Sequence, residues 1–511
     1  MRETVDREFS GLSSSAPMVV VHSQDKTADD PAFEAVVADA QRILAADARV
    51  TEVVPPRRGR SVSRDGHTAI VQAGAGAGSN EMVRAADDLK EPLRRLGGDG
   101  VQVSLTGASG MWSDFNDANR SAMLKSEVIS WPVTMGILLL AFGSLVAAGL
   151  PLMLTILGLV ASAGSLYLGA QVLDISIWAM NFALMFALAL GIDYALFLVY
   201  RFRGAFFGTK LSAEDAVAET MDTAGKAVLF SGLTVLISLS AVMLVPSPAF
   251  RSMALGIMLS VVFILAATLT LLPAVLAKLG PRVDKLSLPW AHSGEHRSPR
   301  FAAWAERLWR RPVAYGAVAV VALVALAIPV LGLQTGMPSI KVVPAGDGSR
   351  VAYAQVQQAF GKGAPGALQV VAPRADAARV AAVANADAGV ARVMAPMPGR
   401  GPDVLVQVVP RDDPSDKRVG ATIDRLRSAL PADAQGGGAV AENHDLETTL
   451  RAKTPLVIGA VLGLGFLLLL VAAGADPRRG RRRHEPARRR RRVRRGPARL
   501  PGRPPRRPAR P

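Results

Sequence analysis

Seven long apolar stretches, each interrupted by few charges, restrict what this chain can fold into. Each is close to the roughly 20 residues that a helix needs to cross the hydrocarbon of a bilayer. Half of the 511 residues are hydrophobic, which together with these runs indicates a polytopic helical membrane protein rather than one soluble domain. Spans are expected at 129–149, 151–171, 177–199, 227–246, 252–274, 313–333 and 454–473.

Two polar regions, residues 1–127 and 334–452, lie outside these apolar stretches. Each shows short strand-like runs that alternate with helix-like segments. The order in both is βαββαβ, so we predict two α+β domains of the ferredoxin-like kind. In the first, strands are expected at Met18–Val21, Arg49–Val54, His67–Gln72 and Val101–Thr106, and helices at 31–45 and 81–96. In the second, strands are expected at Leu368–Val371, Ala391–Met394, Val404–Val409 and Ala439–Ala441, and helices at 375–384 and 421–430.

The polar regions and the apolar stretches that follow them form an internal repeat. Glu8-Phe9 precedes the first strand of one region as Ala359-Phe360 precedes that of the other. The predicted division of the chain is 1–127 (outer domain), 128–280 (five-helix bundle), 281–312 (cytoplasmic basic loop with an interfacial helix at 301–311), 313–333 (helix), 334–452 (outer domain), 453–474 (helix) and 475–511 (tail).

Basic residues in the short loops predict the orientation. Arg201 and Arg203 follow the third stretch, and eight more basic residues lie in 275–312, whereas the opposite short loops contain only Arg251. Both polar domains are therefore expected outside the membrane. Because residues 1–127 would have to cross the bilayer with no preceding span or signal sequence, we expect that a span before Met1 is missing.

The tail, residues 475–511, is unlike the rest of the chain. It carries seventeen arginines against Asp476 and Glu485, a net charge of +15, while the other 474 residues carry +2. Arg, Pro, Ala and Gly make up 32 of its 37 residues, the palette of GC-rich DNA read out of frame, which favours a frameshift near residue 472. The alternatives are a basic arm for anionic lipid or nucleic acid, or an incidental tail.

Asp193 is the most informative single residue. It lies inside the apolar segment Met180–Tyr200, about 12 Å along a helix from the first cytoplasmic arginine. A carboxylate at that depth costs about 2.5–3.5 kcal/mol or more, and such groups usually face a bundle interior and carry protons. Tyr194 adds a hydroxyl. The alternative is a neutral carboxyl that is hydrogen-bonded across helices for packing only.

Neighbouring small and hydroxyl residues are expected to support this carboxyl. Ala187, Gly191 and Ala195 recur at four-residue spacing, which allows another helix to approach closely and keep Asp193 from lipid. Ser231 and Thr234, on the next stretch, could meet Asp193 or a water chain. In the alternative interpretation, these hydroxyls bond only to their own backbone.

Nothing in the sequence indicates an enzyme, a cofactor or a metal site. There is no cysteine, and no nucleophile–base arrangement is visible. His292 and His296 have a zinc-protease spacing, but Gly294 and Pro299 make a helix that presents both histidines improbable.

The segment GIDYALFLVYRFR (Gly191–Arg203), followed by Ala224–Val228 and Ser231–Thr234, resembles the MmpL family of the RND superfamily. The resemblance implies a bacterial inner-membrane protein with twelve spans, two extracytoplasmic porter domains, and proton-driven export of lipids or other hydrophobic compounds. It places the family's proton-carrying Asp-Tyr pair on Asp193 and Tyr194.

The chain departs from that family pattern, because the first helix, everything after the eighth, and a second Asp-Tyr pair have no counterpart. We therefore predict an incomplete transporter of an RND-like bundle with seven spans. Its predicted partners are the lipid bilayer, a hydrophobic or lipid substrate and protons, with no nucleic acid, and homo-oligomerisation is left open. The alternatives are a non-transporting membrane protein that offers a binding surface, and binding of anionic lipid or nucleic acid through the tail.

Overall fold

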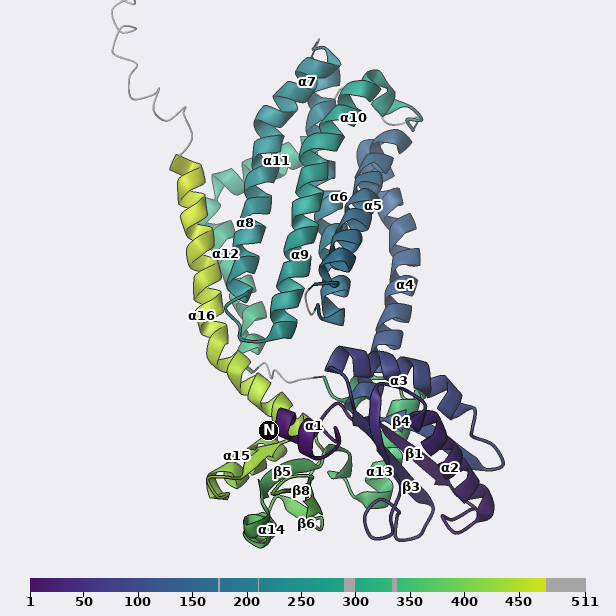
Figure 1. The fold of residues 1–511 in the computed structure, drawn as a ribbon. Coiled ribbons are helices and arrows are strands. Elements are labelled where there is room, and N and C mark those ends of the chain that lie inside the picture. The colour runs from purple at the N-terminus through teal and green to yellow at the C-terminus, as the bar shows by residue number, and fades with distance from the viewer. Residues whose placement is uncertain (173–174, 210, 289–298, 333–337, 475–511) are drawn as a thin grey trace, which may run out of the picture.

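A computed structural model describes residues 1–172, 175–209, 211–288, 299–332 and 338–474. The His292–His296 motif and the tail 475–511 lie outside these residues. Figure 1 shows two parts: a bundle of long helices, and two small β-sheets with their own helices, which lie side by side at one end of the bundle. The helices α7 (Ala213–Thr220), α10 (Leu272–Leu279) and α11 (Pro299–Arg310) lie toward the other end.

The described residues contain seven helices that are long and apolar enough to cross a membrane, as predicted. Short turns of π-helix join α7 to α8 and α9 to α10, so that each pair forms one continuous rod. The long helices are α4 (Gly107–Phe142), α5 (Leu145–Gly169), α6 (Ile177–Phe207), α8 (Lys226–Val242), α9 (Pro248–Ala266), α12 (Pro312–Ala327) and α16 (Ala439–Gly474).

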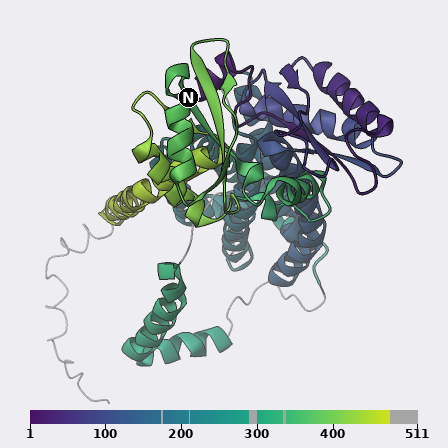
Figure 2. The same cartoon turned by 90° about the horizontal axis from the view of Figure 1, so that it is seen from below.

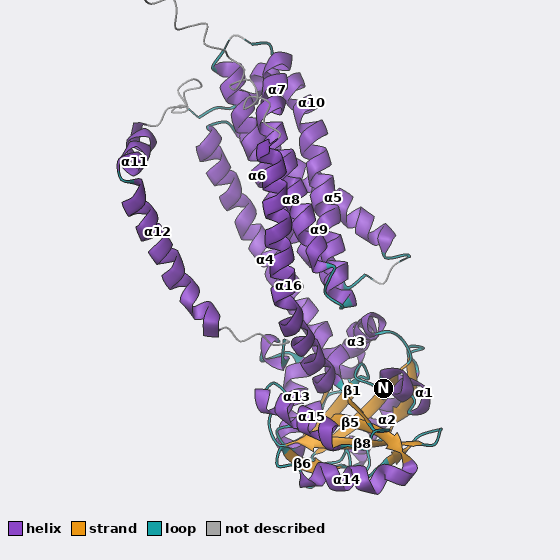
Figure 3. Ribbon diagram, turned by 90° about the vertical axis from the view of Figure 1, so that its left-hand side faces the viewer, coloured by secondary structure: helices purple, strands orange, loops and turns teal. Residues whose placement is uncertain are grey.

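The centre of the bundle is formed by α5, α6 and α9, whose facing side chains are buried together. By contrast, α12 stands apart from the bundle together with α11 (Figures 2 and 3), and all of its side chains are exposed. The part of α16 that follows the sheets lies beside α8.

The first turn of the bundle lies earlier than predicted. We expected the break at Leu150, between the spans 129–149 and 151–171, but α4 ends at Phe142 and α5 begins at Leu145. Gly143 adopts a left-handed conformation, with φ +67°, and the Ser144 side chain accepts a hydrogen bond from the Ala147 amide. These two residues end one helix and begin the next, whereas Pro151 lies inside α5.

The first sheet is antiparallel and has the strand order β2-β3-β1-β4. The side chains of its two central strands pack alternately into two hydrophobic cores, because successive side chains of a strand point to opposite faces. Val19 and Val71 pack under α2 and α3, whereas Val20 and Ile70 face the other side. The elements are α1 (Arg2–Glu8), β1 (Met18–Ser23), α2 (Pro31–Ala45), β2 (Val50–Val54), β3 (Thr68–Ala75), α3 (Ser79–Arg94) and β4 (Val101–Thr106).

The second sheet repeats this order as β6-β8-β5-β9, with the short β7 added to β8. One prediction was wrong: the last strand is β9, not 439–441, because Gly438 turns the chain with φ +98° and Ala439 already begins α16. The elements are α13 (Gly348–Phe360), β5 (Leu368–Pro373), α14 (Ala377–Ala386), β6 (Val390–Val393), β7 (Met397–Pro398), β8 (Asp403–Pro410), α15 (Lys417–Ala429) and β9 (Gln435–Gly437).

The two sheet regions exchange a helix. Val5 and Phe9, on and just after α1, pack on Val371 and Leu405 of the second sheet. In return, Ala352 and Val356 of α13 pack on Val20 and Ile70 of the first sheet. Each sheet therefore has one face covered by its own helices and the other by a helix from the opposite half of the chain.

Candidate functional site

Helix α6 carries Asp193 on an outward-facing stripe. At spacings of three and four residues, which align side chains on one face of a helix, Met185, Ala189, Asp193, Phe197 and Tyr200 are all exposed on the surface of the described chain. This corrects the prediction that Asp193 faces the interior of the bundle. The carboxyl lies on the outer surface of the described helices.

The small residues of α6 lie on the opposite face. Ala187, Gly191 and Ala195 are buried, and a Cβ atom added to Gly191 would lie 2.6 Å from the Thr155 Oγ1 atom of α5 and 3.1 Å from the Ile264 Cδ1 atom of α9. At Gly191 the helices α5 and α9 therefore lie close against this face of α6. This close packing does not shield Asp193, because a two-residue step along a helix turns the side chain by about 200°.

Tyr194 points inward and connects α6 to α8. Its side chain is buried, and its hydroxyl oxygen lies 3.4 Å from the Ser231 Oγ atom. The Thr234 hydroxyl instead donates to the Phe230 carbonyl oxygen at 2.7 Å, which is the backbone interaction that the alternative interpretation predicted. Asp193 and Tyr194 thus sit on adjacent faces of α6, one open and one packed on α8.

A buried ion pair fixes the far end of α6, and sequence reasoning missed it. The Arg203 Nη2 atom lies 2.7 Å from the Asp284 Oδ1 atom, and the two side chains are only 7% and 12% exposed. Arg203 also donates to the Phe142 carbonyl oxygen at the end of α4. Two charges removed from water must pair closely, so this pair ties α6, α4 and the segment after α10 together.

A cavity of about 860 Å³ lies between the two sheet regions. Both regions line it: Ile70 and Trp112 come from the first half of the chain, and Val356, Gln407 and Ile423 from the second. Its lining mixes aliphatic and aromatic side chains with hydroxyl and amide groups and with charged Arg, Lys, Asp and Glu side chains. At its margin the Ser14 hydroxyl donates to the Glu442 carboxylate at 2.9 Å, which joins the loop before β1 to the first turn of α16.

Within the described ranges, no group of three or more His, Asp or Glu side chains is placed to hold a metal ion.

The seven long apolar helices among the described residues define a polytopic helical membrane protein. Residues 1–317 match the MMPL family, and the chain belongs to that family.

Three relatives illustrate the similarity. The chain is 29% identical to Membrane protein YdfJ of Bacillus subtilis, over 92% of this chain and 66% of that protein. It is 34% identical to Putative membrane protein SCO6666 of Streptomyces coelicolor, over 70% of this chain and 51% of that protein. It is 30% identical to Mycolic acid-containing lipids exporter MmpL11 of Mycolicibacterium smegmatis, over 73% of this chain and 41% of that protein. The matched parts therefore span between about two fifths and two thirds of these relatives.

Proposed function

We propose that this chain acts in the export of lipids or other hydrophobic compounds across the bacterial inner membrane, driven by protons that pass Asp193. The observation that carries the proposal is a carboxyl within an otherwise apolar span, next to a tyrosine that contacts another helix. A carboxyl in such surroundings is costly and usually serves ion movement. The membrane potential supplies about 2.3 kcal/mol per charge per 100 mV.

The exposed position of Asp193 fits this role if protons reach it from one side of α6 and Tyr194 relays the change to α8. Protonation removes the charge of Asp193 and changes how the stripe on α6 packs against its surroundings. Tyr194, one residue along, lies in the packed interface and contacts Ser231. A change at one face of α6 is thereby transmitted to the helix on the adjacent face.

The two sheet regions are, in this proposal, ferredoxin-like porter domains on the extracytoplasmic side. Their strand orders and antiparallel pairing support the fold assignment. Both sheets lie at one end of the bundle, and the basic α11 lies toward the other (Figure 1). Because basic loops remain in the cytoplasm, this arrangement supports the predicted orientation.

The substrate class follows from the cavity and from one relative. A space of about 860 Å³ lies within the usual range for sites that enclose drug-sized molecules. Its apolar and polar lining suits an amphiphile, and the M. smegmatis relative is named as an exporter of mycolic acid-containing lipids. We infer that a hydrophobic or lipid molecule occupies the space between the two sheets.

The test is proton flux into liposomes that contain the purified chain and a pH-sensitive dye. Asp193→Asn keeps the size of the side chain but cannot carry a proton, and we expect it to abolish lipid-dependent flux while leaving insertion unchanged. The matched control is Asp222→Asn, which changes an exposed carboxyl paired with Lys226 outside the apolar part of the helix.

Flux that survives in Asp193→Asn would remove Asp193 from the mechanism. If the unaltered chain shows no flux but binds lipid between its sheets, the alternative of a non-transporting binding surface is favoured.

A further inference from the structure

The start of α13 is held by a residue at the end of β4 and a residue of α4 rather than by its own N-cap. Asp347, at the N-cap position, makes no side-chain hydrogen bond to the helix. Instead the Ser349 amide donates to the Asp114 Oδ2 atom at 2.8 Å, and the Thr106 hydroxyl donates to the Ser349 carbonyl oxygen at 3.1 Å. A carboxylate that accepts from the free amides of a first turn is the usual way to stabilise a helix start. Here that carboxylate comes from 235 residues earlier in the chain.

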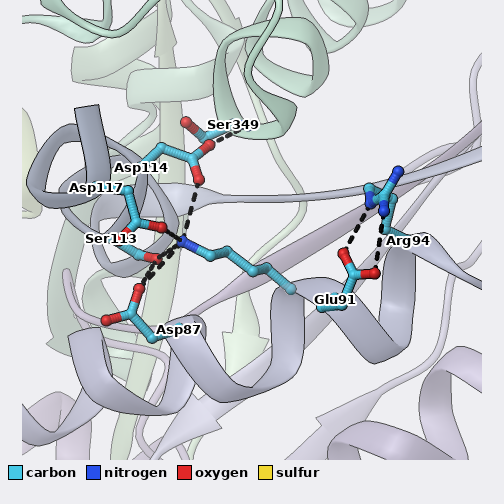
Figure 4. Close-up of polar contacts among 8 residues, drawn as sticks. Asp87, Glu91, Arg94, Ser113, Asp114, Asp117 and Ser349 are labelled. Atoms are coloured by element: carbon cyan, nitrogen blue, oxygen red, sulfur yellow. Dashed lines mark hydrogen bonds and ion pairs between the residues drawn. The ribbon is translucent and has the colours of Figure 1, made fainter. Parts of the chain in front are cut away.

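Lys90 of α3 forms an ion pair with the Asp114 carboxylate, which Figure 4 shows close to Ser113 and Asp117. Its Nζ atom lies 3.6 Å from the Asp114 Oδ1 atom and 2.9 Å from the Ser113 Oγ atom, and it also contacts Asp87 and Asp117. Burial alone would lower the pKa of Lys90, but the hydrogen bonds to Asp117 and Asp87 outweigh it and the pKa is raised. Lys90 therefore stays charged, and the Asp114 side chain is only 13% exposed.

The turn of α4 that carries Asp114 also contacts the first turn of α6. The Trp112 and Trp178 ring centroids are 5.4 Å apart, and those of Phe115 and Trp178 are 5.1 Å apart. Aromatic rings at these separations attract each other beyond the area that they bury. Trp178 lies in the first turn of α6, and Asp193 follows about 22 Å further along that helix.

We propose that the turn 112–117 of α4 is the mechanical link between the helix that carries Asp193 and the helix that is exchanged between the sheets. Trp178 transmits a displacement of α6 to Trp112 and Phe115, and Asp114 passes it to the first turn of α13. Asp114 is thus a positioning residue. The link has a use in transport only under the proposed function, because α13 contributes Val356 to the wall of the cavity.

Proximity alone does not establish such a link. Coupling requires that a change at Trp178 affects α13 through Asp114, and a double-mutant cycle measures this directly as a departure from additivity. The readout is hydrogen exchange of the amides 348–352, followed by mass spectrometry on the whole chain in lipid nanodiscs.

Asp114→Ala removes the acceptor of the Ser349 amide, and we expect about fivefold to tenfold faster exchange in this turn, the usual effect of losing a helix cap. Trp178→Ala is expected to change the same rates at least about twofold when Asp114 is present, and not to change them in the Asp114→Ala background. Equal effects of Trp178→Ala in both backgrounds, or none in either, would overturn the link.

Two variants guard against a merely structural explanation. Asp114→Asn retains a carbonyl acceptor and is expected to restore most of the protection. Glu91→Gln removes a carboxylate of the same helix as Lys90, one that pairs only with Arg94 and Arg95 among the described residues, and is expected to leave α13 unchanged. If Asp114→Ala does not accumulate as folded protein, Lys90→Gln replaces it in the cycle.

The outcome is separable from the proposed function. Absent proton flux with a non-additive cycle would reject transport and keep the link. Proton flux that requires Asp193, with an additive cycle, would keep transport and reject the link.

Discussion

At the scale of single residues, Tyr194 is the group that joins the candidate proton site to a second helix. Tyr194→Phe removes the hydroxyl that lies 3.4 Å from the Ser231 Oγ atom. A separation of that length makes a weak hydrogen bond, so we expect a reduction of proton flux of several-fold rather than its loss, and Ser231→Ala should act similarly.

Thr234→Val provides the comparison in the liposome assay. Because the Thr234 hydroxyl bonds to its own backbone, flux should be nearly unchanged. A Thr234→Val defect as large as that of Tyr194→Phe would contradict a specific role for the tyrosine hydroxyl.

Arg203 gives a prediction about stability. Arg203→Met leaves the buried Asp284 carboxylate without its cation, and breaking a buried pair in this way costs about 3–5 kcal/mol. Arg201→Met breaks an exposed pair with Glu219 and should cost no more than about 1 kcal/mol. Thermal unfolding in detergent separates the two cases.

The double variant Arg203→Met with Asp284→Leu removes both charges and should regain much of the loss. Equal destabilisation by Arg201→Met and Arg203→Met would refute the account of the buried pair.

The residues of the candidate site were only partly predictable. Asp193 stands out because any carboxyl in an apolar span does. Its direction was not predictable, because a helix that is apolar on every side offers no polar face by which to orient it. The Arg203–Asp284 pair joins residues 81 positions apart that follow no local pattern, so sequence reasoning took Arg203 only as a sign of the cytoplasmic side.

At the scale of elements, Asp387 joins the end of α14 to α15. Its carboxylate accepts two hydrogen bonds from Arg425 at 2.8 Å and one from the Gly389 amide at 2.7 Å. The hydrogen bond from Arg425 holds the pKa of Asp387 below its usual 3.8, despite the opposing effect of burial.

The sign of the pH dependence follows from that direction. A carboxyl whose pKa is lowered by folding stabilises the folded state above pH 3.8, and this contribution is lost as the pH falls through the lower folded value. Asp387→Asn should therefore lower the melting temperature at pH 6 and have a smaller effect at pH 2. Circular dichroism checks this, with Asp433→Asn as an exposed control in the same domain. A deficit that is equal at both pH values would contradict it.

The elements themselves were largely predictable, since strand and helix periodicities are local. The predicted and observed elements differ where the backbone conformation of a single glycine sets the end of one element and the start of the next. Gly143 ends α4 ahead of Pro151, and Gly438 turns the chain so that Ala439 begins a helix. Neither conformation can be inferred from apolar patterning, because glycine is also common where no helix ends.

At the scale of the whole molecule, the cavity between the sheets gives a prediction about substrate passage. Gln407→Trp places a large ring in the cavity wall, and we expect lipid-dependent flux to fall severalfold because the space is shared with the substrate. Gln407→Asn keeps a smaller amide at the same position and should be nearly neutral in the same liposome assay. Unchanged flux in Gln407→Trp would place the substrate path elsewhere.

The exchange of α1 and α13 was beyond sequence reasoning. The repeat indicated that the segments before the two first strands correspond, but an amphipathic pattern specifies that a face is covered, not by which element. Only the packed structure shows that Val5 is buried against the second sheet and Val356 against the first.

This exchange has a consequence during synthesis. The ribosome completes β4 at Thr106, but the face of the first sheet that contains Val20 and Ile70 receives its cover only when α13 has emerged, at Phe360. At ordinary elongation rates that delay is roughly 10–50 s. For that time a nascent domain displays an apolar surface while the six long apolar helices α4, α5, α6, α8, α9 and α12 are made. Protection of this intermediate by chaperones therefore becomes part of making the protein.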